Sequence, residues 1–310
     1  MASQANQALP AGTRVENYRI VSTLASGGFS TVYLAHDDKE TPVVIKEYLP
    51  STLAVRTDSA AAPKVAAADL AKFRYGVKCF FEEGRALAKL THPNVVRVLN
   101  FFRANETVYI VMRYEKGRPL QLQIQHRVGM PDEVWVRSTF AELLNGLREV
   151  HRNKLLHLDI KPANVFLRTD GSPLLIDFGA ARQTLSGEIE KLAPTYTPGF
   201  AAPEQYARRA ELGPWTDIYS IGATLYACLA GAAPPPAHER LKKDELVPAR
   251  KRWAEQYSRV LLDIIDWCLR LDHLERPQSV LALQKALLGE KDPERQASGV
   301  LRFLKRKPSA

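Results

Sequence analysis

The sequence has little cysteine and no long hydrophobic run. Its 310 residues include only three cysteines, Cys79, Cys228 and Cys268, which stand far apart. This spacing predicts neither a disulfide framework nor a zinc site, and a reducing cytoplasm is the expected compartment. No apolar stretch approaches the roughly 20 residues that cross a bilayer. Residues 1–10 lack the basic and then apolar build of a secretory signal.

The composition is otherwise that of an ordinary globular protein. Hydrophobic residues make up 45% and charged residues 25% of the chain. The length suits one large domain or a two-lobed one. A net charge of +9 raises the hypothesis of nucleic-acid binding, because Lys and Arg neutralise phosphates. The basic residues are scattered, however, with one modest cluster at positions 302–307, so a solvated tail is the preferred interpretation.

Two short polar motifs stand in the middle of the chain. Residues 157–164 read His-Leu-Asp-Ile-Lys-Pro-Ala-Asn, and residues 177–179 read Asp-Phe-Gly. The apolar run just before the second motif is typical of a buried strand. A hairpin turning at Asp170-Gly171 would bring Asn164 and Asp177 to the same end of two paired strands. Side-chain oxygens held in this way suit Mg²⁺, which binds a few protein oxygens together with substrate phosphates.

In this order and spacing, the two motifs resemble the catalytic loop and the metal-binding motif of the eukaryotic-like (Hanks-type) bacterial serine/threonine protein kinases. The resemblance implies that Asp159 positions the substrate hydroxyl and accepts its proton. It implies that Lys161 neutralises the γ-phosphate, and that Asn164 and Asp177 bind Mg²⁺, with Mn²⁺ as an alternative. Lys161, together with Thr197 ahead of residues 203–204, indicates Ser/Thr rather than Tyr specificity.

The N-terminal part of the resemblance begins with two strand-like runs around a glycine-rich turn at residues 24–35. Gly27 keeps the central glycine of the kinase loop, whereas Ala25 and Ser30 stand at the other two glycine positions. Lys46 ends a buried-type strand, where a lysine is rare unless it is paired. Its expected partner is Glu83, which lies on the apolar face of a helix over residues 80–90, and the neighbouring Glu82 is read as a solvated acid.

An unusually long connection separates Lys46 from that helix. Its opening, residues 48–56, resembles a phrase of a subset of bacterial Ser/Thr kinases, and we expect it to pack on the small lobe. An Ala/Pro-rich piece at residues 60–68 is expected to be mobile, because connections longer than about 12–15 residues are functional or disordered. A helical stretch is predicted over about residues 66–75, with Asp69 near its start.

The remaining motifs follow in family order. Residues 107–112 are strand-like, and with residues 113–117 they resemble the kinase hinge. The resemblance implies that Met112 guards the back of the adenine pocket and that backbone groups of residues 113–115 read the adenine edge. The resemblance assigns the ATP-binding residues Leu24, Gly27, Gly28, Val32, Val44, Lys46, Met112, Arg113, Tyr114, Glu115 and Phe166. It places Thr184, Ser186, Thr195 and Thr197 in the activation segment. Structural roles are expected for three further residues: Glu204 pairs with Arg276, and Asp217 binds the catalytic-loop backbone.

Leu158 stands where many protein kinases have an arginine that grips a phosphorylated activation loop. Leucine has neither charge nor donor, so we expect basal activity without phosphorylation of Thr184, Ser186 or Thr195.

We therefore predict an α+β, two-lobed protein-kinase fold. Its parts are a flexible N-terminal arm (1–17), a kinase domain (18–289) and a basic C-terminal tail (290–310). Within the kinase domain we expect a small β-rich N-lobe with one main helix (about 18–112), a hinge (113–117) and a mainly helical C-lobe (118–289). The predicted activity is ATP-dependent transfer of the γ-phosphoryl group to Ser/Thr hydroxyls of protein substrates, including the chain itself, in bacterial signalling.

The expected cofactors are ATP and Mg²⁺. The expected partners are protein substrates, a cognate phosphatase and a dimer for autophosphorylation, with neither nucleic acid nor membrane. Two alternatives stay open. A pseudokinase or ATP-binding scaffold is suggested by Ala25, Ser30 and Leu158, but every charged catalytic group is retained. A small-molecule phosphotransferase is disfavoured by residues 197–204, which in protein kinases form the peptide platform.

Overall fold

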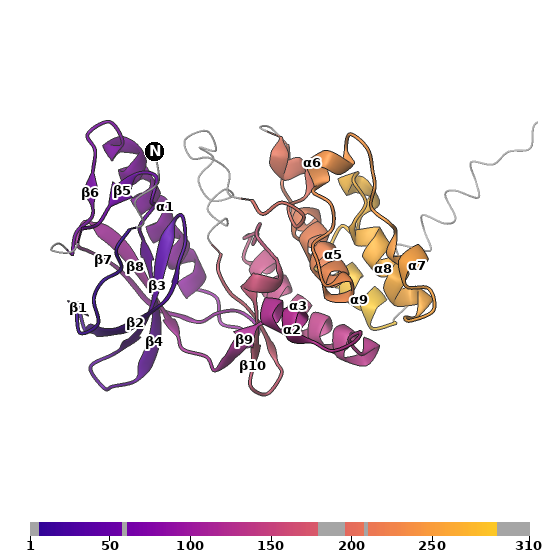
Figure 1. Ribbon diagram of the computed structural model, residues 1–310, viewed down its shortest axis with the longest axis horizontal. Coiled ribbons are helices and arrows are strands. Elements are labelled where there is room, and N and C mark those ends of the chain that lie inside the picture. The colour runs from indigo at the N-terminus through magenta and orange to yellow at the C-terminus, as the bar shows by residue number, and fades with distance from the viewer. Residues whose placement is uncertain (1–5, 58–60, 179–195, 208–209, 290–310) are drawn as a thin grey trace, which may run out of the picture. The chain divides into compact units, whose positions relative to one another are not determined.

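A computed structural model describes residues 6–57, 61–178, 196–207 and 210–289 (Figure 1). The chain forms two compact units. The first contains residues 1–117 and 178–194, and the second contains residues 118–177 and 195–310. Among the described residues, no helix is both long and apolar enough to span a membrane.

The first unit is built on a six-stranded antiparallel sheet with strand order β1-β2-β3-β4-β8-β7. Alternate side chains of β3 are buried, as the two-residue period of a strand on a core requires. One face of the sheet packs Ile20, Tyr33, Ile45 and Tyr109 into a hydrophobic core. The strands are β1 (Arg14–Val15), β2 (Tyr18–Ser26), β3 (Ser30–His36), β4 (Pro42–Tyr48), β7 (Val98–Ala104) and β8 (Thr107–Arg113).

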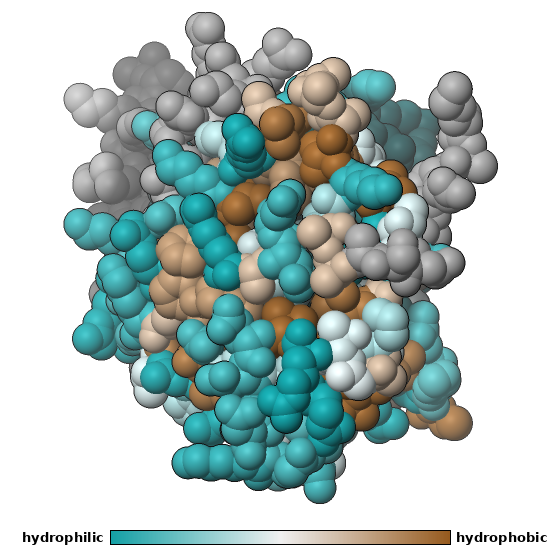
Figure 2. Space-filling model, turned by 90° about the vertical axis from the view of Figure 1, so that its left-hand side faces the viewer, coloured by the Kyte–Doolittle hydropathy of each residue, from teal (hydrophilic) through white to brown (hydrophobic). Residues whose placement is uncertain are grey.

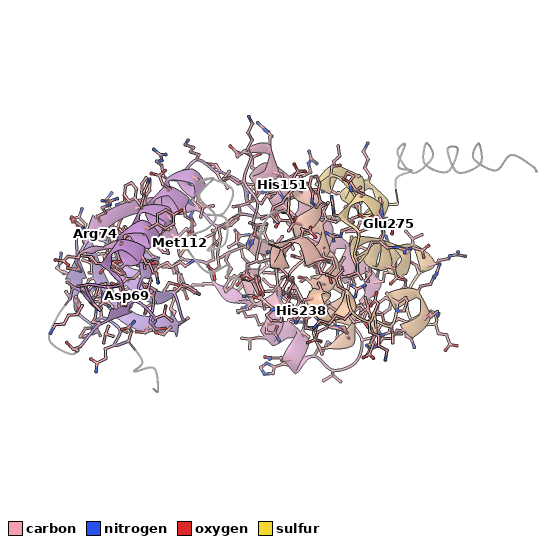
Figure 3. All side chains as sticks on the ribbon, turned by 90° about the horizontal axis from the view of Figure 1, so that it is seen from above. Asp69, Arg74, Met112, His151, His238 and Glu275 are labelled. Atoms are coloured by element: carbon pink, nitrogen blue, oxygen red, sulfur yellow. The ribbon has the colours of Figure 1, made fainter. Side chains whose placement is uncertain are left out.

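One long helix, α1 (Leu70–Ala88), packs against β7 and β8. It begins directly after Asp69, which Figure 3 labels together with Arg74 of the helix. The helical stretch predicted over about residues 66–75 is present from Leu70 onward, and it is continuous with the Glu83 helix. Gly76 does not interrupt it, because tertiary packing of the apolar face stabilises a helix more than local propensity does.

The connection before α1 carries a small hairpin of β5 (Ala54–Val55) and β6 (Lys64–Val65). Its opening is buried, as predicted, with Leu49 and Arg56 almost inaccessible to solvent. Within residues 61–68, however, Lys64 and Val65 pair with β5 and Pro63 is buried, whereas Ala61, Lys64 and the alanines at 66–68 are exposed. The hairpin brings this piece back onto the unit.

The expectation of a loose arm over residues 1–17 is wrong for residues 6–17. Leu9 and Val15 are buried in the core of the first unit. Asn6 binds the connection through its side chain, donating to the Ala54 carbonyl at 3.0 Å. The composition of this segment is small and polar, yet Leu9, Val15 and the Asn6 side chain attach it to the first unit.

The second unit is mainly helical and surrounds the buried helix α5 (Pro214–Ala230). Residues 216–229 of α5 are all buried, and α8 and α9 pack against it. A helix that is buried on every side belongs in the centre of a domain. The other helices are α2 (Leu120–His126), α3 (Glu133–Arg152), α6 (Ala237–Arg240), α7 (Ala249–Arg252), α8 (Arg259–Cys268) and α9 (Val280–Leu287).

A three-stranded sheet with order β11-β10-β9 lies next to two predicted site residues: Asn164 directly precedes β10, and Asp177 follows β11. Its strands are β9 (Gly117–Pro119), β10 (Val165–Arg168) and β11 (Pro173–Leu175). Short 3₁₀ turns cover Pro162–Asn164, Pro203–Tyr206 and His273–Glu275. On the face shown in Figure 2, hydrophobic residues form small groups between hydrophilic side chains, which is ordinary for a protein surface.

Candidate active site

In the first unit, strand β4 buries a lysine against a helix glutamate. The Lys46 residue is 7% exposed, and its Nζ lies 3.9 Å from Glu83 Oε1. The same ammonium lies 5.6 Å from the centroid of the Phe80 ring. Glu82 forms a surface ion pair with Arg85 instead. The structure thus places Glu83 beside Lys46, the pairing that the apolar face of the helix predicted.

Three apolar side chains share the sheet face of Lys46. Val32 is the register partner of Lys46, and Val44 is the partner of Met112 on β8. All three are half-buried, and Figure 3 labels Met112. Residues two apart on a strand point to the same side, so Val44 and Lys46 line one surface. This surface can take the flat, apolar face of an adenine while a cation stands at its edge.

The glycine-rich turn joins β2 to β3 at residues 27–29. The Gly27 amide donates to the Ser30 carbonyl at 2.9 Å, which closes the turn. The Gly28 carbonyl accepts from the Ser51 amide at 2.9 Å, so the segment after β4 anchors the turn. Leu24 on β2 and Phe29 in the turn are exposed, at 50% and 39%. Ala25 and Ser30 fit because they continue the two strands, where no glycine is needed.

In the second unit, the Asp159 carboxylate is surrounded by three hydrogen-bond donors. Lys161 Nζ lies 2.8 Å from Oδ2, and Asn164 Nδ2 donates to the same oxygen at 3.0 Å. The Thr197 hydroxyl donates to Oδ1 at 2.7 Å and accepts from Lys161 Nζ at 2.8 Å. A carboxylate held in this way is an oriented acceptor for a hydroxyl group, with a cation beside it.

The catalytic loop turns at Leu158, whose φ of 63° lies in the left-handed region. A non-glycine residue stays there only when its surroundings hold it. Asp217 provides this support, because its carboxylate accepts from the amides of Leu158 at 2.7 Å and His157 at 2.9 Å. Leu158 itself is 1% exposed, which makes it a core residue of the loop.

Asp217 is fully buried and charged. Burial alone would raise the pKa of its carboxyl, but His151 donates to it at 2.7 Å, and this bond, with the charge of His151 and the His157 amide, lowers that pKa below its ordinary value. The ionised form is thus the one that the fold uses to hold the loop.

The hairpin of β10 and β11 sets the position of the two predicted metal ligands. Val165 pairs with Leu175, and the Ile176 amide donates to the Asn164 carbonyl at 3.0 Å. The predicted hairpin is therefore present, with Asn164 and Asp177 at the same end of it. Asp177 has a φ of 61°, a second left-handed non-glycine residue at this place. Phe166 is half-buried on β10.

These residues fit Mg²⁺ by their chemistry. Asn164 Nδ2 donates to the Asp159 side chain and carbonyl, which leaves Oδ1 as the amide atom that would bind a cation. Asp177 adds a carboxylate. Within the described ranges, no group of three or more His, Cys, Asp and Glu side chains is placed to hold an ion. A site of one carboxylate and one amide suits an ion that takes its other ligands from phosphates and water.

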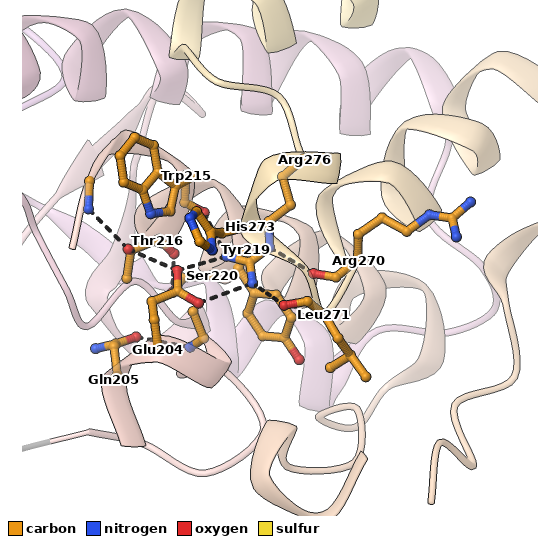
Figure 4. A network of polar contacts seen from close by, with 12 residues as sticks. Glu204, Gln205, Trp215, Thr216, Tyr219, Ser220, Arg270, Leu271, His273 and Arg276 are labelled. Carbon is orange, nitrogen blue, oxygen red and sulfur yellow. Dashed lines mark hydrogen bonds and ion pairs between the residues drawn. The ribbon is translucent and has the colours of Figure 1, made fainter. Parts of the chain in front are cut away.

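A buried ion pair anchors the segment that follows Thr197. Arg276 binds both carboxylate oxygens of Glu204, at 2.8 and 3.0 Å (Figure 4). Its other donations go to three backbone carbonyls, those of Arg270, Leu271 and Trp215. The predicted pairing of Glu204 with Arg276 is present. Through the Trp215 carbonyl, Arg276 also joins this segment to the start of α5.

The sequence reasoning missed two supporting residues. The Gln205 side-chain amide donates to the Leu158 carbonyl at 2.9 Å, which ties the Glu204 segment to the catalytic loop. The His157 ring is fully buried: Nε2 donates to the Ile176 carbonyl at 3.1 Å, and Nδ1 accepts from the Asp159 amide at 3.4 Å. His157 stands inside the catalytic-loop motif and Gln205 directly follows the segment at residues 197–204, which was the available signal.

The structure does not describe four residues of the predicted motifs. Thr184, Ser186 and Thr195, like Gly179, lie outside the described residues, and so does the tail at 290–310. Of the hinge residues, Arg113 is the last residue of β8, and its amide donates to the Arg97 carbonyl at 2.9 Å. Tyr114 and Glu115 follow the strand. Their contact with adenine stays a prediction.

Comparison with known proteins matches this geometry to one family. The family described as "Protein kinase domain" covers residues 18–288. "Serine/threonine-protein kinase C" of Synechocystis sp. is 28% identical over 292 residues, covering 88% of this chain and 49% of that protein. "Serine/threonine-protein kinase B" of Synechocystis sp. is 32% identical over 231 residues, covering 70% of this chain and 37% of that protein. The chain thus spans less than half the length of these two relatives.

A solved structure, PpkA-294 in its apo form, superposes with a TM-score of 0.79 and 34% identity, covering 90% of this chain and 99% of that one. This likeness confirms the predicted α+β kinase fold, with a curled sheet in one unit and helices in the other. The chain belongs to the protein kinase family, and within it to the eukaryotic-like serine/threonine kinases of bacteria.

Proposed function

We propose that this chain transfers the γ-phosphoryl group of ATP to Ser and Thr hydroxyls of proteins, itself included. The observation that carries the proposal is the Asp159 carboxylate, which already accepts a hydrogen bond from a threonine hydroxyl at 2.7 Å beside the Lys161 ammonium. An acceptor Ser or Thr would present the same chemical group to the same carboxylate. Lys161, 2.8 Å from Asp159, would stand next to the phosphate that this hydroxyl attacks.

The transfer forms one bond, breaks one bond and moves one proton, and few side chains take part in it. The hydroxyl oxygen of the acceptor bonds to the γ-phosphorus as the bond from that phosphorus to the bridging oxygen breaks, and ADP leaves. Asp159 positions the hydroxyl and takes its proton. Lys46, paired with Glu83, orients the phosphates, and the shared face of Val32, Val44 and Met112 holds the adenine. Such reactions depend on positioning and charge stabilisation rather than covalent help from the protein.

Mg²⁺, bound by Asn164 and Asp177, would neutralise charge on the phosphates of ATP. The chain's own part is to hold these two side chains at one end of the β10–β11 hairpin, with Asp177 fixed in a left-handed conformation. Mn²⁺ has the same preference for oxygen ligands and could replace it.

Autophosphorylation with mapped sites tests the proposal. The purified chain is incubated with ATP and MgCl₂, and phosphosites are located by mass spectrometry. The native chain should acquire phosphoserine or phosphothreonine, and Asp159→Ala should acquire none under the same conditions. A native chain that binds ATP without any transfer would overturn the proposal and favour the scaffold alternative. A rate that rises with protein concentration would identify transfer between two copies.

A further inference from the structure

The strand that carries Lys46 also buries a second charged pair, which the reaction does not use. Glu47 follows Lys46 on β4, and the two-residue period of a strand turns its side chain to the opposite face of the sheet. Glu47 is 0% exposed and its partner Arg56 is 3% exposed. Three consecutive residues of β4, from Lys46 to Tyr48, are therefore all buried.

Four donors occupy the Glu47 carboxylate. Arg56 binds it with both guanidinium nitrogens, Nη1 to Oε2 at 2.8 Å and Nη2 to Oε1. The hydroxyls of Tyr33 and Tyr109 donate to Oε2 and Oε1 at 2.7 and 2.6 Å. Burial, with the charge of Glu47, raises the pKa of both tyrosines, so their hydroxyls stay protonated donors at neutral pH. The acceptor capacity of the carboxylate is filled.

Arg56 joins this carboxylate to two other parts of the chain. Its Nε donates to the Ala61 carbonyl at 3.0 Å, which holds the β5–β6 hairpin. Its amide donates to Asn6 Oδ1 at 2.9 Å, and the Leu9 amide donates to the Tyr33 hydroxyl at 3.1 Å. The N-terminal segment, the hairpin and strands β3, β4 and β8 thus meet at Glu47.

The opposite face of the same strand segment meets α1. Lys46 faces Glu83, and the Tyr48 ring packs against Phe73 and Phe80 with centroids 5.5 Å apart in both cases. A Cβ added at Gly76 would lie 1.9 Å from the Tyr48 hydroxyl, so helix and strand touch directly. The position of Lys46 relative to α1 therefore depends on the position of β4. Glu47 fixes β4 from the opposite face of the sheet.

A buried ion pair is a poor choice for stability alone, because apolar residues of similar volume often stabilise as much or more. A carboxylate with four hydrogen bonds does fix the positions of its donors, because each bond has a preferred length and direction. From this geometry we infer that Glu47 and Arg56 are positioning residues for Lys46: they lock the N-terminal segment and the β5–β6 hairpin to the back of β4 and so hold the phosphate-binding lysine against Glu83.

The inference rests on the proposed function, in which Lys46 binds ATP phosphates, and a double-mutant cycle tests it. The dissociation constant for ATP is measured by calorimetry on the native chain, Glu47→Gln, Lys46→Met and the double variant, each shown to be folded by circular dichroism. Tyr33→Phe and Tyr109→Phe each delete one donor hydroxyl but keep the ring, so they serve if Glu47→Gln does not fold. Tyr219→Phe is the matched control, because its buried hydroxyl accepts from Arg240 Nη1 at 3.0 Å in the second unit.

Glu47→Gln is expected to weaken ATP binding about tenfold, and each hydroxyl deletion about threefold. In the Lys46→Met background these effects should vanish, because the residue through which they act is gone. Tyr219→Phe should leave the dissociation constant within about twofold. Equal weakening in both backgrounds, or by Tyr219→Phe, would overturn the inference, and so would unchanged binding in all folded variants. A native chain that fails to bind ATP would instead overturn the proposed function.

Discussion

At the scale of single residues, Thr197 is the side chain whose removal is most informative. Its hydroxyl bridges Asp159 Oδ1 and Lys161 Nζ, at 2.7 and 2.8 Å, so it orders both groups that the proposed reaction requires. Neither bond depends on phosphorylation. Thr197 is therefore a positioning residue that links the end of the activation segment to the catalytic loop.

We expect Thr197→Ala to lower kcat/KM for phosphoryl transfer by about 10- to 100-fold, since a hydrogen bond to a charged group contributes about 1.5–3 kcal/mol. Thr197→Ser keeps the hydroxyl and should stay within about threefold of the native chain. Initial rates with saturating MgATP measure both. An alanine variant as active as the serine variant would show that the hydroxyl bridge has no part in the reaction.

Asp217 gives a pH-dependent prediction. Its folded-state pKa lies below the ordinary 3.8, so its contribution to stability is fully present above that value and is lost as pH falls through the folded pKa. Asp217→Asn removes the charged acceptor of two amides and His151, and we expect it to lower the free energy of unfolding by about 3–5 kcal/mol at neutral pH.

Urea unfolding of the native chain and Asp217→Asn between pH 3 and pH 8 measures this contribution. The difference between the two proteins should shrink as the pH falls below about 4, where the Asp217 carboxylate becomes protonated. A difference that grows as the pH falls below about 4 would mean that the charged carboxylate is not what holds the loop.

At the scale of elements, the contact between β4 and α1 fixes the two residues of the Lys46–Glu83 pair. Gly76 allows this contact, because the Tyr48 ring occupies the space of a Cβ at that position. An alanine in the middle of a helix usually stabilises by about 1 kcal/mol relative to glycine. Here the added methyl group would have to displace a ring that is buried between Phe73 and Phe80.

We therefore predict that Gly76→Ala lowers the free energy of unfolding by about 1–3 kcal/mol, the usual cost of overpacking, instead of raising it. Lys78→Ala is the control on the same helix, since Lys78 is exposed and its truncation leaves Tyr48 untouched. Chemical denaturation measures both variants. A stabilised Gly76→Ala chain would show that α1 can move away from β4 at little cost.

The elements also show what the sequence could predict. The catalytic loop, the β10–β11 hairpin and the pairing of Lys46 with Glu83 were predictable, because each depends on residues close in sequence or on one helical face. The continuity of α1 was not, since Gly76 and the polar residues around it weaken the periodic pattern. The bond from Asn6 to Ala54 spans 48 positions, and the bonds of Arg56 to Asn6 and to Glu47 span 50 and 9. These bonds were not predictable either, because nothing in an isolated asparagine or arginine indicates its partner.

At the scale of the whole molecule, the first unit depends on its N-terminal segment. Leu9 is 3% exposed, and fully burying a leucine side chain stabilises by about 1.5–3 kcal/mol. Deletion of residues 2–9 should therefore lower the free energy of unfolding by about that amount or more. Deletion of residues 2–5, which lie before the described part of the chain, is the control and should change it little. Equal stability of the two shortened chains would mean that residues 6–9 contribute nothing.

The central claim, which rests on the proposed function, is that phosphoryl transfer requires polar groups of each unit. Lys46→Met removes the ammonium of the first unit, and Asp177→Ala removes a carboxylate of the second. Neither side chain is part of a hydrophobic core, so both variants should keep the fold.

The most direct measurement is the initial rate of ³²P transfer from γ-labelled ATP to Ser and Thr, compared for the native chain, Lys46→Met and Asp177→Ala at equal concentration. The account predicts transfer by the native chain and loss of at least about 100-fold in either variant, with unchanged circular dichroism. A rate within about tenfold of native in either variant, a barrier change of no more than about 1.4 kcal/mol, would contradict it.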